Sequence, residues 1–149
     1  MRVFLDTTYL LPFVGIEVEE IPQEFLESLF GSDNILVINE LSLFELMGKA
    51  LKVLKGKDAK ERFNVGVKSI MESDRIKRYP IFTLDSFSVA MELHEKGLDD
   101  LSDRPITASA LCYSDLMLTE ADDIPIIVRK VDAKFKVMKW AMFQEEFLS

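Results

Sequence analysis

Short apolar runs alternate with longer amphipathic segments along the whole chain. The short runs are typical of buried strands, whereas the longer segments repeat apolar residues at helical spacing, most clearly in the segment 40–54. Strands separated by helices indicate an α/β fold with a parallel sheet and right-handed crossovers. The expected strands are Arg2–Leu5, Asn34–Ile38, Tyr79–Phe82, Leu116–Leu118 and Lys136–Lys139.

The helical segments begin and end at residues that favour helix termini. Pro12 limits the first helix, and a glycine follows three of the others. Asp85 is the expected N-cap of one helix, and Ser102 or Asp103 that of the next. The pattern assigns no element to residues 124–131. The expected helices are Thr7–Pro12, Pro22–Phe30, Glu40–Leu54, Asp58–Met71, Asp85–Lys96 and Asp103–Tyr113.

Composition indicates one globular domain over residues 1–149. The chain is 48% hydrophobic and 30% charged, and a chain of 149 residues needs no disulfide or metal to hold its core together. A single cysteine, Cys112, and a single histidine, His94, exclude a disulfide framework and a Cys- or His-rich metal site. Any metal ligands are therefore expected to be carboxylates.

The apolar N-terminus is interrupted by Asp6 and lacks a basic leader, so it does not read as a signal peptide. No run of about 18 apolar residues predicts a membrane span, and a cytoplasmic location is expected. A net charge of −8 argues against nucleic-acid binding, but residues 49–78 hold 10 of the 18 basic residues and only 4 of the 26 acidic ones. Such a local basic region can bind a phosphate backbone or can be a solvated helix surface.

Acidic residues follow the predicted strands. Asp6 comes directly after the first strand, Glu45 lies in the helix after the second, and Asp103 begins a helix. Ligands of parallel sheets bind outside the carboxyl ends of the strands, so these side chains are expected to converge. Mg²⁺ prefers oxygen ligands, and a pair of such ions can stabilise both the attacking and leaving oxygens of a phosphodiester.

Each acid also has an ordinary structural explanation. Asp6 is a candidate helix N-cap, and Asp103 suits the first turn of a helix. Glu45 could form a capping box with Ser42 or pair with Lys49. The two acids after Thr119, Asp122 and Asp123, are also typical of a turn. The order and spacing of the acids together carry the prediction, and no single acid does.

That order resembles the PIN-domain family of metal-dependent nucleases, which includes toxin ribonucleases of toxin–antitoxin pairs. Residues 3–11 resemble the family's opening strand, Asp and apolar helix, and residues 41–46 resemble its second motif around a glutamate. Asp103 is followed by Ala108 and Ala110 at the family's spacing, and Thr119 falls where a Thr or Ser usually stands. The sequence departs from the family at Ala121, where a fourth Asp is common.

The resemblance implies a three-layer α/β/α sandwich around a mainly parallel sheet of four or five strands. It further implies that Asp6, Glu45 and Asp103 hold Mg²⁺ or Mn²⁺ for hydrolysis of an RNA phosphodiester. Asp122 is the preferred candidate for the fourth acid, and Glu120 and Asp123 are the next candidates. The other residues and partners that it implies are Thr7 or Thr119 to orient an acid or a water, Lys49 and Lys52 to hold RNA, an antitoxin protein, and a second copy in a homodimer.

Two other interpretations compete with a nuclease. A PIN-like domain without metal would be a binding or scaffold module, and Ala121 motivates this alternative. A receiver domain or a haloacid-dehalogenase-like phosphatase also places an Asp after the first strand. The phosphatase needs a second Asp two residues later, where Thr8 stands, and the receiver needs an acidic neighbour that Asp6 lacks.

Overall fold

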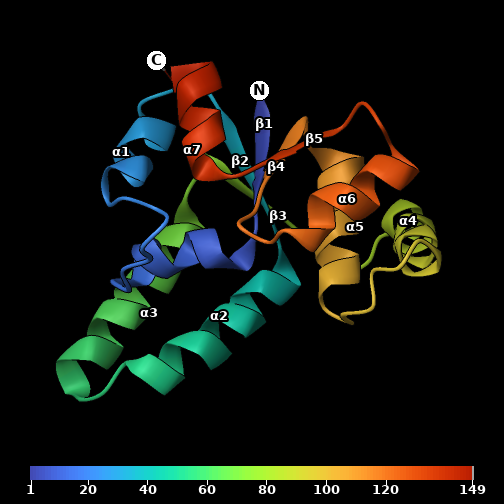
Figure 1. Cartoon of the computed structure of the whole chain (residues 1–149). Helices are drawn as coiled ribbons and strands as arrows, with labels where there is room; N and C mark the ends of the chain where they lie inside the picture. Colours follow the sequence, from blue (N-terminus) through green and yellow to red (C-terminus); the bar gives the residue numbers. More distant parts are fainter. Residues whose placement is uncertain (149) are drawn as a thin grey trace.

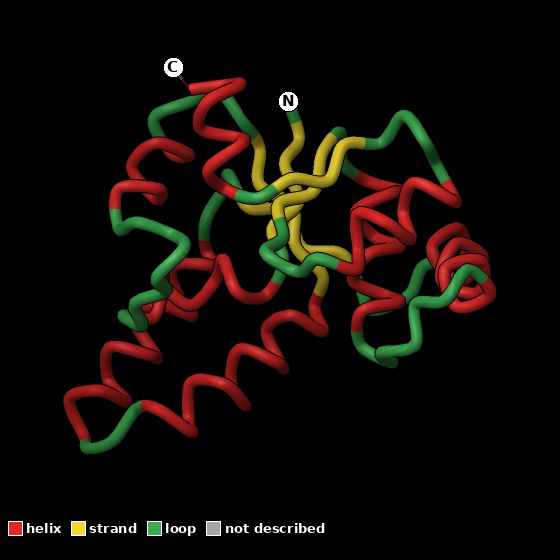
Figure 2. Tube along the Cα trace, in the orientation of Figure 1, coloured by secondary structure: helices red, strands yellow, loops and turns green. Residues whose placement is uncertain are grey.

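A computed structural model describes residues 1–148, apart from the side chain of Leu26; Ser149, the last residue of the predicted domain, lies outside the described residues. Its centre is a five-stranded, fully parallel sheet in the order β3-β2-β1-β4-β5 (Figures 1 and 2). The strands are β1 (Arg2–Leu5), β2 (Ile35–Asn39), β3 (Ile76–Tyr79), β4 (Leu116–Leu118) and β5 (Lys136–Met138).

Helices cover both faces of this sheet (Figure 1). One face carries the 3-10 helix η1 and the helices α1, α2, α3 and α7, and the other carries α4, α5 and α6. The predicted α/β/α sandwich is therefore confirmed. The helices are η1 (Thr7–Val14), α1 (Glu24–Phe30), α2 (Glu40–Val53), α3 (Lys57–Glu72), α4 (Leu84–Glu95), α5 (Asp103–Tyr113), α6 (Asp123–Val131), α7 (Trp140–Phe143) and the terminal π-helical turn η2 (Gln144–Leu148).

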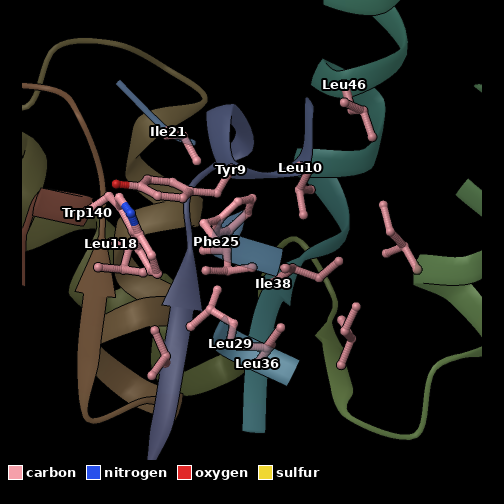
Figure 3. Packing of buried hydrophobic residues seen from close by; sticks show 14 of the residues in the cluster. Tyr9, Leu10, Ile21, Phe25, Leu29, Leu36, Ile38, Leu46, Leu118 and Trp140 are labelled. Carbon is pink, nitrogen blue, oxygen red and sulfur yellow. The ribbon is translucent and has the colours of Figure 1, made fainter. Parts of the chain in front are cut away.

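Residues 3–5 of β1 and the whole of β4 are apolar without a break because alternate residues of these central strands point to opposite covered faces. Val3 and Leu5 of β1 enter one core cluster, and Phe4 between them enters the other. In the first cluster the rings of Tyr9, Phe25 and Trp140 pack edge to face, with centroids 5.8 and 5.4 Å apart (Figure 3). This packing fixes η1, and with it the residue that precedes η1, against the end of the sheet.

Helix α3 crosses η1 at unusually short range. A Cβ at Gly66 would lie 2.2 Å from the carbonyl oxygen of Phe13, so only glycine allows this approach. The crossing places the basic helix α3 directly against the segment that follows β1.

Two predictions of local structure need correction, and one segment that the pattern left open forms a helix. The third strand is Ile76–Tyr79 rather than 79–82, because Pro80 cannot donate to the ladder and the exposed Lys77 and Arg78 are tolerated at an edge. Thr83, not Asp85, is the N-cap of α4, through a reciprocal capping box with Ser86. The unassigned segment forms α6, whose apolar face packs on α4 and β5.

Within residues 1–148, no helix is both long enough and apolar enough to cross a lipid bilayer.

Candidate active site

The acids that follow the strands lie where the strand order reverses. Strands β2 and β3 extend the sheet on one side of β1, and β4 and β5 extend it on the other. The carboxyl ends of β1 and β4 therefore flank the crevice in which parallel sheets bind ligands. Asp6 directly follows β1, and Thr119 directly follows β4.

Asp6 is both a helix cap and a member of this site. Its Oδ1 accepts a hydrogen bond from the Thr7 N–H at 2.8 Å, as the N-cap of η1. Its Oδ2 accepts one from the Thr119 hydroxyl at 2.7 Å. The capping explanation of Asp6 is thus correct, and it leaves the carboxylate facing β4.

Glu45 reaches the same crevice from α2. Its Oε1 accepts a hydrogen bond from the Thr7 hydroxyl at 2.7 Å, and its Oε2 accepts one from the Ser102 hydroxyl at 2.9 Å. The capping-box explanation is wrong, because Asn39 caps α2 by accepting the Leu41 N–H at 2.8 Å. Glu45 therefore links the end of β1 to the start of α5.

Burial and mutual repulsion raise the pKa values of two acids here. Burial raises the pKa of Asp6, although hydrogen bonds from Thr119 and Thr7 and the charge of Lys49 oppose this. The pKa of Asp103 rises to about 7, first through burial and then through the charges of Asp100, Asp6, Glu45 and Asp123. The charges of acids from separate segments thus act on Asp103, and a pKa raised by burial and neighbouring charges is common at functional sites.

The candidates for a fourth acid occupy different places. Asp122, the preferred candidate, is highly exposed and forms an ion pair with Lys139 at 2.8 Å, which lowers its pKa. Glu120 accepts hydrogen bonds from the Tyr9 hydroxyl at 2.5 Å and the Trp140 N–H at 3.1 Å, so it ties η1 to α7. Asp123, at the start of α6, is the candidate whose charge acts on Asp103.

The donor chemistry of the site suits a hard divalent cation. Among residues 1–148, Asp6, Glu45 and Asp103 form no ion pair with a basic side chain. Uncompensated carboxylates at a partly buried site need a proton or a cation, and oxygen ligands suit Mg²⁺ or Mn²⁺. The described side chains do not, however, form a group of three acids already close enough to hold an ion.

Three residues shape the site although the sequence pattern did not place them in it. Asn39 is buried, and its amide donates to the backbone before α4 and to Ser109 of α5, so it anchors α2 beside α5. Ser102 contacts Glu45, and Asp100 contacts Ser102. An Asn between a strand and a helix is a recognisable cap signal, but the direction of the Ser102 side chain depends on tertiary contacts.

The two lysines predicted to bind RNA, Lys49 and Lys52, are both exposed on α2. Only Lys49 is near enough to the acids to lower the pKa of Asp6.

Comparison with known proteins shows the fold. No family model and no curated protein matches the sequence. The structure is similar to a chain of VapBC2 from Rickettsia felis, solved bound to a DNA fragment from their promoter, with a TM-score of 0.62, 17% identity, and 94% of this chain and 99% of that chain covered. It is also similar to a chain of FitAcB from Neisseria gonorrhoeae, with a TM-score of 0.59, 19% identity, and coverage of 91% and 96%. The sandwich is therefore PIN-like.

Proposed function

We propose that the protein is a divalent-metal-dependent ribonuclease and the toxin of a toxin–antitoxin pair. The observation that carries this proposal is the placement of Asp6 and Glu45 at the switch point of the sheet, where Thr7 contacts both carboxylates. The charges of Asp6, Glu45 and Asp123 act on Asp103, and among residues 1–148 no basic side chain is paired with Asp6, Glu45 or Asp103. Both similar structures are toxin–antitoxin complexes, which supports a role in such a pair. The acids at this end of the sheet support the nuclease member of the pair over the DNA-binding member.

Asp6, Glu45 and Asp103 would hold Mg²⁺ or Mn²⁺, with Asp123 as the fourth acid. When bound, the ion would supply a Lewis acid for phosphodiester hydrolysis. The Thr7 and Thr119 hydroxyls donate to Glu45 and Asp6, so they orient the two carboxylates. Because the threonines are neutral donors, they satisfy oxygens of the two carboxylates without bringing a positive charge to the site.

The direct test is cleavage of a labelled single-stranded RNA with Mn²⁺, with Mg²⁺ and with EDTA. Parent protein should cleave only with metal, and Asp6→Asn should not cleave. Asp123→Asn should lose activity, whereas Asp122→Asn, its matched neighbour, should keep it. Equal activity of Asp6→Asn and the parent would refute the carboxylate assignment, and a loss confined to Asp122→Asn would restore Asp122 as the fourth acid.

The RNA is proposed to lie along the basic residues of α2 and α3, starting at Lys49 and Lys52. Changing both lysines to Ala should weaken RNA binding and flatten its dependence on salt. The reason is that a protein with fewer phosphate contacts releases fewer counterions from the RNA when it binds. Filter binding between 50 and 200 mM salt measures this slope, and an unchanged slope would exclude both lysines from the RNA surface.

A second candidate function is a PIN-like module without catalysis. Two observations favour it. Ala121 stands where the PIN-domain family commonly has its fourth Asp, and the described acids do not form a group close enough to hold a metal ion. A ligand that binds only the folded state must raise the melting temperature. A Mn²⁺ thermal-shift titration without effect, together with no cleavage, would favour this module over the nuclease.

A further inference from the structure

Ser102 stands at the N-cap position of α5 but does not cap it. A serine there usually accepts a hydrogen bond from the second or third N–H of the helix. Here the side chain makes no capping hydrogen bond. Its hydroxyl lies 2.9 Å from Glu45 Oε2 and 2.9 Å from Asp100 Oδ1. The serine is therefore turned away from its own helix and toward the acids.

Asp100 takes over the capping. Its Oδ1 accepts hydrogen bonds from the Ser102 N–H at 3.0 Å and the Asp103 N–H at 3.2 Å. The start of α5 is thus held without the Ser102 hydroxyl. Loss of that hydroxyl should consequently cost the helix little, which separates any role at Glu45 from a role in folding.

The Ser102 hydroxyl has one hydrogen and two carboxylate acceptors at equal distance. It can donate to Glu45 or to Asp100, but not to both at once. The Thr7 hydroxyl fixes the other oxygen of Glu45, so the two hydroxyls together hold the plane of this carboxylate. Each carboxylate oxygen has two lone pairs, so Glu45 Oε2 can keep the hydrogen bond from Ser102 while its other lone pair faces a ligand.

We propose that Ser102 is a positioning residue that presents Glu45 to a divalent cation, and that Asp100 holds Ser102 in place. This inference rests on the proposed function, since the cation is the one that Asp6, Glu45 and Asp103 would bind. Hydrogen-bond partners of metal ligands commonly change metal affinity by about 10–100-fold when they are removed.

The test is Mn²⁺ binding by calorimetry, with unfolding in EDTA as a separate measurement. Ser102→Ala should raise the Kd for Mn²⁺ about tenfold and leave the melting temperature in EDTA unchanged. Ser102→Thr keeps the hydroxyl and should bind within about twofold of the parent. Ser88→Ala, at an exposed serine of α4, is the matched control and should bind as the parent does. If Ser102→Ala does not fold, Ser102→Gly also lacks the hydroxyl and suits an N-cap.

Asp100→Ala should weaken Mn²⁺ binding less than Ser102→Ala does, because it acts through the serine. Unchanged Mn²⁺ affinity in Ser102→Ala, beside a parent that binds Mn²⁺, would overturn the inference alone. A parent that binds no Mn²⁺ would overturn the metal-dependent function and this inference with it. In an RNA assay the positioning role predicts that kcat falls while KM for RNA stays, and the reverse pattern would also overturn it.

Discussion

Asp103→Asn should make the metal-free protein more stable at pH 8 than the parent, with no such advantage at pH 4. The pKa of Asp103 is about 7 in the folded protein, against an ordinary value of 3.8. Between these values the folded state binds more protons than the unfolded state, so stability falls as the pH rises from 4 through 7. Asparagine has no proton to lose and escapes this fall.

The magnitude follows from the size of the shift. A difference of about 3 pH units would correspond to about 4 kcal/mol if the carboxyl were fully shielded from solvent. Asp103 is only partly buried, and solvent screening reduces this to about 1–2 kcal/mol. For a chain of this length that is an increase of about 2–8 °C in melting temperature at pH 8.

The assay is thermal unfolding in EDTA from pH 4 to pH 8, for the parent, Asp103→Asn and Asp99→Asn. Asp99 is an exposed acid in the same loop and controls for the loss of one charge. Adding Mn²⁺ at pH 8 should reverse the order, since the parent alone gains binding energy. An Asp103→Asn protein with the melting temperature of the parent at every pH would refute the reasoning.

Two further predictions concern the scaffold, and chemical denaturation tests both. Gly66→Ala should destabilise the protein by about 1–3 kcal/mol because its Cβ would lie 2.2 Å from the Phe13 carbonyl oxygen. Gly48→Ala, whose Cβ would have no atom within 4 Å, is the control and should stabilise the protein by about 0.5–1 kcal/mol. Equal effects of the two substitutions on stability would refute the close crossing of α3 and η1. Tyr9→Phe should cost about 1–3 kcal/mol because Glu120 loses one of its two donors and keeps only the Trp140 N–H, and a loss below about 0.5 kcal/mol would show that the Tyr9 hydrogen bond matters little.

Sequence predicted the central strands better than the edges. β1 and β4 match their expected bounds because both faces of a central parallel strand are covered, which leaves an uninterrupted apolar run. β3 was misplaced because an edge strand tolerates Lys77 and Arg78, so its pattern resembles a loop. The segment that forms α6 was left open because short apolar runs suit a strand or a helix equally.

The candidate site was predictable to the level of segments but not of side-chain directions. Asp6, Glu45 and Asp103 were predicted as candidates because the ends of parallel strands must meet at one edge of a sheet, and the charges of Asp6 and Glu45 do act on Asp103. Choosing between Asp122 and Asp123 requires knowing how α6 begins, since adjacent residues at a helix start point about 100° apart. The sequence does not show in which direction these side chains point. For the same reason it placed Ser102 at the start of a helix but did not show that its hydroxyl faces Glu45.

The hydrogen-bond donors around Asp6 and Glu45 bring no positive charge to the site. Thr7, Thr119 and Ser102 satisfy oxygens of Asp6 and Glu45 with neutral hydroxyls. Lysine or arginine in their place would bind the same oxygens more strongly, but would also cancel the charge that attracts a cation. The hydroxyls fix the carboxylates and leave the repulsion among the acids intact, and burial together with this repulsion raises the pKa of Asp103. The acids thus destabilise the metal-free fold, and a bound divalent cation would relieve that destabilisation.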